Sequence, residues 1–127
     1  MAIRTELSLR LQNSPGALGG VCRALSDEHV NILAMSVEAS GQLRMVVDNH
    51  VHAAAILRDR HHSVTERSVV LLELSNAPGS LGTTLKLVAD AGINLDYVYG
   101  GGGDGEPSAA VVLGVDDAMK ASAAAGI

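Results

Sequence analysis

Hydrophobic and polar positions alternate near the start of the chain and then change to a helical spacing. Leu7, Leu9 and Leu11 are separated by polar residues, which is the two-residue period of a half-buried strand. From residue 18 to about residue 28 the apolar positions recur every three or four residues, which predicts a helix. Between them, Asn13-Ser-Pro15-Gly16 combines residue types that favour turns. The pattern therefore begins strand, turn, helix.

A second copy of this pattern begins 63 residues later. Within residues 9–31, nine identities occur at this one offset without a gap: Leu9/Leu72, Leu11/Leu74, Asn13/Asn76, Pro15/Pro78, Gly16/Gly79, Leu18/Leu81, Gly19/Gly82, Asp27/Asp90 and Asn31/Asn94. Self-similarity at a fixed offset indicates repeated structural units. We expect two domains, residues 1–66 and 67–127.

Each copy continues with two strands and a second helix. The predicted strands are 32–38 and 43–47, then 95–99 and 109–113, and residues 62–66 form a fourth strand of the first copy. The second helices are predicted at 50–60 and 116–125, the latter with Asp116 as its N-cap. The order βαββαβ, given twice, predicts an α+β fold of two ferredoxin-like units, with antiparallel sheets and helices on one face.

The second copy departs from the first at its end. At the constant offset Ile127 aligns with Val64, so the second unit lacks most of its last strand. Either this unit has three strands, or a segment from elsewhere completes its sheet. Because an open sheet edge favours pairing with another chain, we expect a homodimer.

Composition excludes several classes of protein. The formal net charge is −5 and falls entirely in residues 64–127, and Tyr97 and Tyr99 are the only aromatic residues. A basic surface and stacking platforms for nucleic acid are therefore absent. Apolar runs are far shorter than the roughly 20 residues of a membrane-spanning helix. A single cysteine, Cys22, and no signal-peptide pattern predict a cytoplasmic protein.

The repeated loop is the strongest candidate for a binding site. A glycine lets a ligand approach the backbone closely, and the free N–H groups at the start of a helix favour a carboxylate. An Asn side chain offers both a donor and acceptors for the groups of a small zwitterion. The alternative is purely structural: Asn-x-Pro-Gly forms a turn, and Asn31 and Asn94 only cap the connection from helix to strand.

Two βαββαβ copies with Asn-x-Pro-Gly-x-Leu and a downstream Val-Asn-Ile or Ile-Asn-Leu resemble tandem ACT domains. The likeness covers nearly the whole chain, and Leu95 to Tyr99 with the glycine-rich segment after it is similar to the second half of small, stand-alone double-ACT proteins. The resemblance implies a regulatory module that binds amino acids at interfaces between ACT units, with sheets joined side by side.

The resemblance also implies which residues contact the ligand. The positions that match the family's ligand loop, and those that open the next strand, are Asn13, Pro15, Gly16, Leu18, Gly19, Asn31 and Ile32 in the first copy and Asn76, Pro78, Gly79, Leu81, Gly82, Asn94 and Leu95 in the second. Some serine-sensing members have a His two residues before the loop Asn. Leu11 and Leu74 stand there, which argues against serine.

Other chemistry has weaker support. Gly100, Gly102 and Gly105 match GxGxxG, but a strand rather than a helix is predicted to follow. We therefore expect a flexible hairpin that could cover a ligand as a lid, and no dinucleotide site. Four histidines near the second helix could suggest a metal, although solvated side chains are the simpler interpretation; they are His50, His52, His61 and His62. Cys22 is interpreted as a small core residue.

The sequence thus predicts a non-catalytic regulatory module that binds a small amino acid, without a metal or cofactor. The alternative is an assembly module without a ligand, which partners a separate enzyme or regulator. No paired carboxylates, triad or metal set support an enzyme. Tyr97 and Tyr99, two apart on a strand, are predicted to point to one face, either in the core or at an interface.

Overall fold

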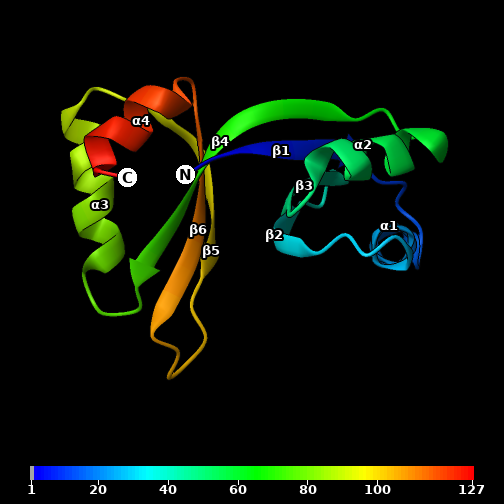
Figure 1. The fold of residues 1–127 in the computed structure, drawn as a ribbon, viewed down its shortest axis with the longest axis horizontal. Helices are drawn as coiled ribbons and strands as arrows, with labels where there is room; N and C mark the ends of the chain where they lie inside the picture. Colours follow the sequence, from blue (N-terminus) through cyan, green and yellow to red (C-terminus); the bar gives the residue numbers. More distant parts are fainter. Residues whose placement is uncertain (1) are drawn as a thin grey trace. The chain divides into compact units, whose positions relative to one another are not determined.

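The computed structural model describes residues 2–127, which divide into two compact units. The first unit is Thr5–Arg67, and the second unit is Ser68–Ile127 together with the N-terminal residues through Arg4. Hydrogen bonds connect six strands in the order β2-β3-β1-β4-β6-β5. The α+β class and the two βαββαβ-like units are confirmed, but the strands belong to one hydrogen-bonded sheet instead of two (Figure 1).

The first unit follows the predicted order of elements. It contains most of β1 (Ile3–Arg10), then α1 (Ala17–Asp27), β2 (Ile32–Val37), β3 (Gln42–Val47), α2 (His50–Asp59) and the first residues of β4 (Thr65–Ser75). Strand β3 pairs antiparallel with both β1 and β2. The alternate strand residues Leu7, Leu9 and Leu43 share one core with Leu25 and Leu57 from the helices. The period-two pattern therefore faces the helices, as the sequence predicts.

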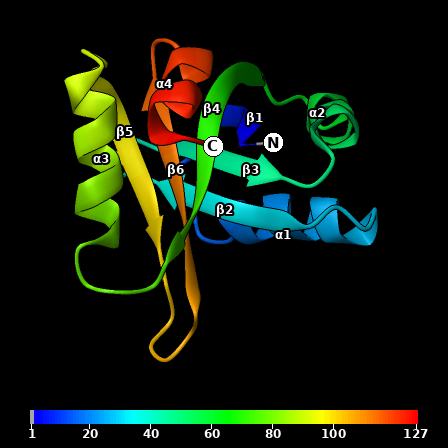
Figure 2. The same cartoon turned by 60° about the vertical axis from the view of Figure 1, so that its left-hand side comes forward.

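The second unit repeats this arrangement. The rest of β4 is followed by α3 (Ser80–Asp90), β5 (Leu95–Gly101), β6 (Ser108–Val115) and α4 (Ala118–Ala125). Strand β6 pairs antiparallel with β4 and β5. Leu72 and Leu113 of the sheet, Val88 of α3 and Ala121 of α4 form its core, so that both helices cover the same face (Figures 1 and 2).

The prediction that the second unit lacks most of its last strand is wrong. The backbone N–H of Leu71 in β4 donates to the carbonyl of Ala2, at 2.7 Å, and Ala2 and Ile3 pack against the core of the second unit. The N-terminal residues thus lie where the fourth strand of this unit is expected. An unpaired edge beside β4 is avoided without a second chain.

The prediction failed because the strand that completes this unit comes from the N-terminal residues, which the repeat assigns to the first copy. The offset between the copies is also not constant. The N-caps of α2 and α4 are Asn49 and Asp117, 68 positions apart, whereas the loops before α1 and α3 are 63 apart. Five additional residues therefore lie in the β5–β6 hairpin, and Ile127 corresponds to Asp59 near the end of α2. The same shift moves the N-cap of α4 from the predicted Asp116 to Asp117, whose side chain accepts from the Lys120 N–H at 2.9 Å.

Candidate functional site

A glycine begins the first helix of each unit. Gly16 before α1 and Gly79 before α3 have φ of 84° and 87°, in the left-handed region that favours glycine. Neither helix has a side-chain cap at its N-terminus. The backbone amides of Leu81 and Gly82, in the first turn of α3, therefore have no capping side chain and lie at the positive end of the helix dipole.

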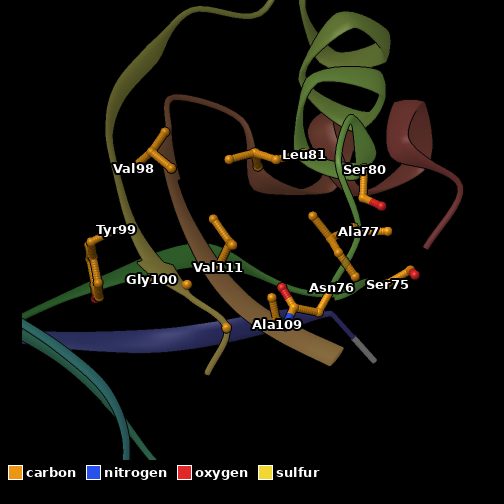
Figure 3. A pocket seen from close by; sticks show the side chains of 13 residues that line it. Ser75, Asn76, Ala77, Ser80, Leu81, Val98, Tyr99, Gly100, Ala109 and Val111 are labelled. Carbon is orange, nitrogen blue, oxygen red and sulfur yellow. The ribbon is translucent and has the colours of Figure 1, made fainter. Parts of the chain in front are cut away.

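A cavity of about 250 Å³ lies in the second unit beside this helix start. It is bounded by the end of β4, the loop into α3, and the ends of β5 and β6 that meet in the hairpin (Figure 3). Its lining is mostly apolar and has no charged side chain: Leu74, Ser75, Asn76, Ala77, Ser80, Leu81, Val98, Tyr99, Gly100, Gly101, Gly102, Ala109 and Val111. Such a hollow suits a small molecule with an uncharged side chain.

Asn76 connects the loop to the hairpin. Its Nδ2 donates to the carbonyls of Gly103, at 2.9 Å, and Glu106, at 2.8 Å, and its backbone N–H donates to the Pro107 carbonyl, at 3.1 Å. Both donors of the amide group are thus used inside the protein. Asn76 lines the cavity and positions the hairpin beside it, which differs from the expectation that its amide would take the ligand directly.

Two glycines of the hairpin permit this close approach. A Cβ on Gly102 would lie 2.7 Å from the Asn76 side chain, and one on Gly100 would lie 2.2 Å from the Ala110 carbonyl oxygen. Gly100 also has a φ of 138°, which L-residues rarely adopt. The glycines that resemble GxGxxG therefore shape a β-hairpin between β5 and β6. This confirms the expectation of a hairpin rather than of the strand-to-helix turn that binds dinucleotides.

Of the predicted site residues in the second copy, the structure brings only Asn76 and Leu81 to the cavity. Pro78, Gly79 and Gly82 stay in the loop and the first turn of α3, while Asn94 and Leu95 lie at the start of β5. The sequence reasoning missed Val98, Tyr99, Ala109 and Val111. The unequal hairpin lengths were the signal that could have found them, because the longer hairpin brings the ends of β5 and β6 to the loop.

The first copy arranges its equivalents differently. Leu18 and Ile32 pack against the core of the first unit. The backbone N–H of Asn31 donates to Oδ1 of Asp48, at 3.0 Å, while Pro15, Gly16 and Gly19 remain in the loop and first turn of α1. Asn13 is exposed, and within residues 2–127 its side chain does not form the hydrogen bonds to a hairpin that Asn76 forms. The turn between β2 and β3 is short, and the Gly41 N–H donates back to the Glu38 carbonyl.

The remaining candidates are placed as follows. Among residues 2–127, no group of three His, Cys, Asp or Glu side chains could hold a metal ion. Cys22 is half-buried and lies outside the first core, so the expectation of a core cysteine is wrong. Tyr97 and Tyr99 share a face as predicted, with ring centroids 6.1 Å apart. In the described part of the chain, no helix is long and apolar enough to cross a membrane.

Comparison with known proteins agrees with this architecture. The family model described as "ACT domain" matches residues 5–61. Protein BT0572 from Bacteroides thetaiotaomicron has a similar structure, with a TM-score of 0.87 and 27% identity, over 97% of this chain and 86% of that chain. No curated protein sequence matches significantly.

Regulatory parts of aspartate kinases share the fold. The ligand-free regulatory subunit from Thermus thermophilus has a TM-score of 0.67 and 17% identity, over 98% of this chain and 90% of that chain. Aspartokinase III of E. coli, in complex with lysine and aspartate, has a TM-score of 0.61 and 15% identity, over 95% of this chain and 30% of that chain. The family model and the near-full-length structural likeness coincide with the repeated loop-and-helix motif, and the match places an ACT domain at residues 5–61.

Proposed function

We propose that the protein is a non-catalytic regulatory module whose second unit binds a small amino acid in the cavity beside Asn76. The observation that supports this most is the coincidence of an uncapped helix start with a mostly apolar cavity of about 250 Å³. A helix start of this kind favours a carboxylate, and the cavity provides room for a side chain. The second unit is accordingly proposed to be an ACT domain as well.

The ligand's carboxylate would accept hydrogen bonds from the amides of Leu81 and Gly82. Its ammonium group would donate to oxygens of the loop and hairpin, such as backbone carbonyls of Gly100–Gly102, which line the cavity. Leu74, Leu81 and Val111 would surround the side chain. Because no charged side chain lines the cavity, amino acids with a charged side chain would lose hydration without gaining an ion pair.

A second copy of the chain would close the open side of the cavity. Leu81 and Val98 line it and still have 39% of their surface exposed, and Leu87 and Leu95 on the same two elements are also exposed. Apolar side chains gathered on α3 and the edge strand β5 favour association. A ligand bound at such an interface would stabilise the dimer, which is how the module would signal to a separate enzyme.

The proposal is tested by a thermal-shift screen against the twenty amino acids. A ligand at 100 times its dissociation constant stabilises a protein by about 2.7 kcal/mol, which would raise the midpoint by several degrees. Ala109→Leu, which fills the cavity, should abolish the response. Asn13→Ala, at the equivalent loop of the first copy, should leave it intact. A flat response to every amino acid at millimolar concentration would refute ligand binding.

The exposed apolar residues on α3 and β5 also favour the alternative, an assembly module without a ligand. The two functions separate in one measurement of molar mass by light scattering. Regulation predicts a dimer whose dissociation constant falls when the ligand from the screen is added. Assembly alone predicts a dimer that is insensitive to amino acids, and that Leu87→Glu disrupts because it places a charge within the apolar surface.

A further inference from the structure

A second cavity, of about 450 Å³, lies in the first unit, where β1 ends and where α2 leads into β4. Its lining is basic and polar: Arg10, Gln12, Arg60, His61, His62 and Ser63. No Asp or Glu lines it, although the whole chain has a formal charge of −5. Two guanidinium groups and two imidazoles therefore surround one hollow.

One of these histidines, at the end of α2, has an unfavourable backbone conformation. His61 has a φ of 71°, its N–H donates to the Arg58 carbonyl, and the His62 N–H donates to the Leu57 carbonyl. This is the left-handed position that closes a helix and that favours glycine. Gly92 and Gly126 occupy it after α3 and α4, with φ of 76° and 77°. Histidine stands at this position after α1 and α2, as His29 and His61, and of the two only His61 lines the cavity.

The two arginines of the cavity have no acidic partner. Arg10 Nη1 donates to the Ser40 carbonyl, at 2.9 Å, which orients the guanidinium and leaves its other N–H donors for a ligand. Within residues 2–127 neither Arg10 nor Arg60 forms an ion pair, whereas the neighbouring Arg58 is 3.3 Å from Glu66. Asp27, Glu28 and Asp59 line a separate hollow, which Arg60 also borders.

We propose that this cavity binds a phosphorylated small molecule. Guanidinium groups form bidentate hydrogen bonds with phosphate oxygens, and a phosphate carries up to two charges that several donors can share. A monocarboxylate would use one arginine and leave the other cation facing it unpaired. The Gln12 amide, the Ser63 hydroxyl and the histidines supply additional donors. This site is separate from the amino-acid site proposed for the second unit and would add a second effector.

The proposal is tested by calorimetric titration of the full chain with inorganic pyrophosphate at low salt. We expect saturable binding of one equivalent per chain that weakens as salt is added. Arg10→Gln combined with Arg60→Gln should raise the dissociation constant at least tenfold, because charge-assisted hydrogen bonds are lost. Arg23→Gln removes one positive charge from an exposed position of α1, away from the cavity, and should change the dissociation constant less than twofold.

His61→Gly separates binding from folding. Glycine suits the backbone at this position, so the melting temperature should stay the same or rise while the dissociation constant increases about threefold or more. His29→Gly is the matched control, because His29 closes α1 with a φ of 60° and does not line the cavity. Equal weakening by both glycine variants, equal weakening by Arg23→Gln and the double variant, or tighter binding of succinate than of pyrophosphate would each overturn the proposal.

Discussion

Asn13 and Asn76 are identical residues of the repeat with different roles in the structure. The Asn76 side chain donates to two hairpin carbonyls, while Asn13 is exposed. We predict that Asn76→Ala lowers the free energy of unfolding by about 1 kcal/mol, since a net hydrogen bond contributes about 0.5–1.5 kcal/mol and these are exposed. Urea denaturation should show this loss, and hydrogen exchange should accelerate in residues 102–107. Asn13→Ala is the control, and an equal effect there would contradict the assigned role.

Gly114 is required by an aromatic ring on the neighbouring strand. It pairs with Tyr97 across β5 and β6, and a Cβ at this position would lie 2.3–2.6 Å from the ring. Gly114→Ala should displace Tyr97 from its stack with Tyr99 and cost about 1–3 kcal/mol, the usual cost of overpacking. Near-ultraviolet circular dichroism measures this directly, because these tyrosines are the only aromatic residues. Gly101→Ala, where a Cβ meets nothing within 4 Å, should leave the spectrum unchanged.

At the scale of single residues, the sequence predicted positions better than contacts. Asn76 and Leu81 were identified because they repeat, and repetition is visible in a sequence. The need for glycine at position 114 was missed because it comes from the ring of Tyr97, which is 17 positions earlier in the sequence and on the neighbouring strand. The contacts of Asn76 with the hairpin were not predicted either, since nothing in a local motif shows that residues 27 and 30 positions later accept from its side chain.

At the scale of elements, the length of the β5–β6 hairpin determines which residue of the second copy corresponds to the N-cap of α2. Asp117, and not its neighbour Asp116, caps α4. Asp117→Ala should destabilise the protein by about 1 kcal/mol, the typical cost of losing an N-cap. Asp116→Ala removes the same charge and should stay within about 0.5 kcal/mol of the unchanged protein. Urea unfolding of both variants tests the assignment, which fails if Asp116→Ala has the larger effect.

The elements themselves were largely predictable, and their alignment was not. Alternating leucines and helical spacing placed the strands and helices of both copies within a few residues. The five-residue difference in the hairpins was not recognised, because glycine-rich turns contain no periodic apolar positions that would fix an alignment. This single omission produced two errors, the Asp116 cap and the alignment of Ile127 with Val64. It also concealed why the larger hairpin, and the cavity beside it, occur in the second unit.

At the scale of the molecule, the chain uses its N-terminal residues in the second unit although they precede the first repeat. Ile3 packs against the second core, and the Leu71 N–H donates to the carbonyl of Ala2. Because sequence order alone assigns residues 1–66 to one domain, this arrangement was not predicted. A residue of the first repeat should therefore control the stability of the second unit.

Ile3→Ala tests this directly. Complete truncation of a buried isoleucine costs about 2–5 kcal/mol, and Ile3 is half-buried, so we expect a loss of about 1–2 kcal/mol. Hydrogen exchange should accelerate at Leu71 and along β6 more than at Leu43 or Met45 in the first core, because only the second unit loses packing. Arg4→Ala, at the exposed neighbouring position, should change neither. Equal acceleration in both units, or acceleration confined to the first, would show that the N-terminal residues do not complete the second unit.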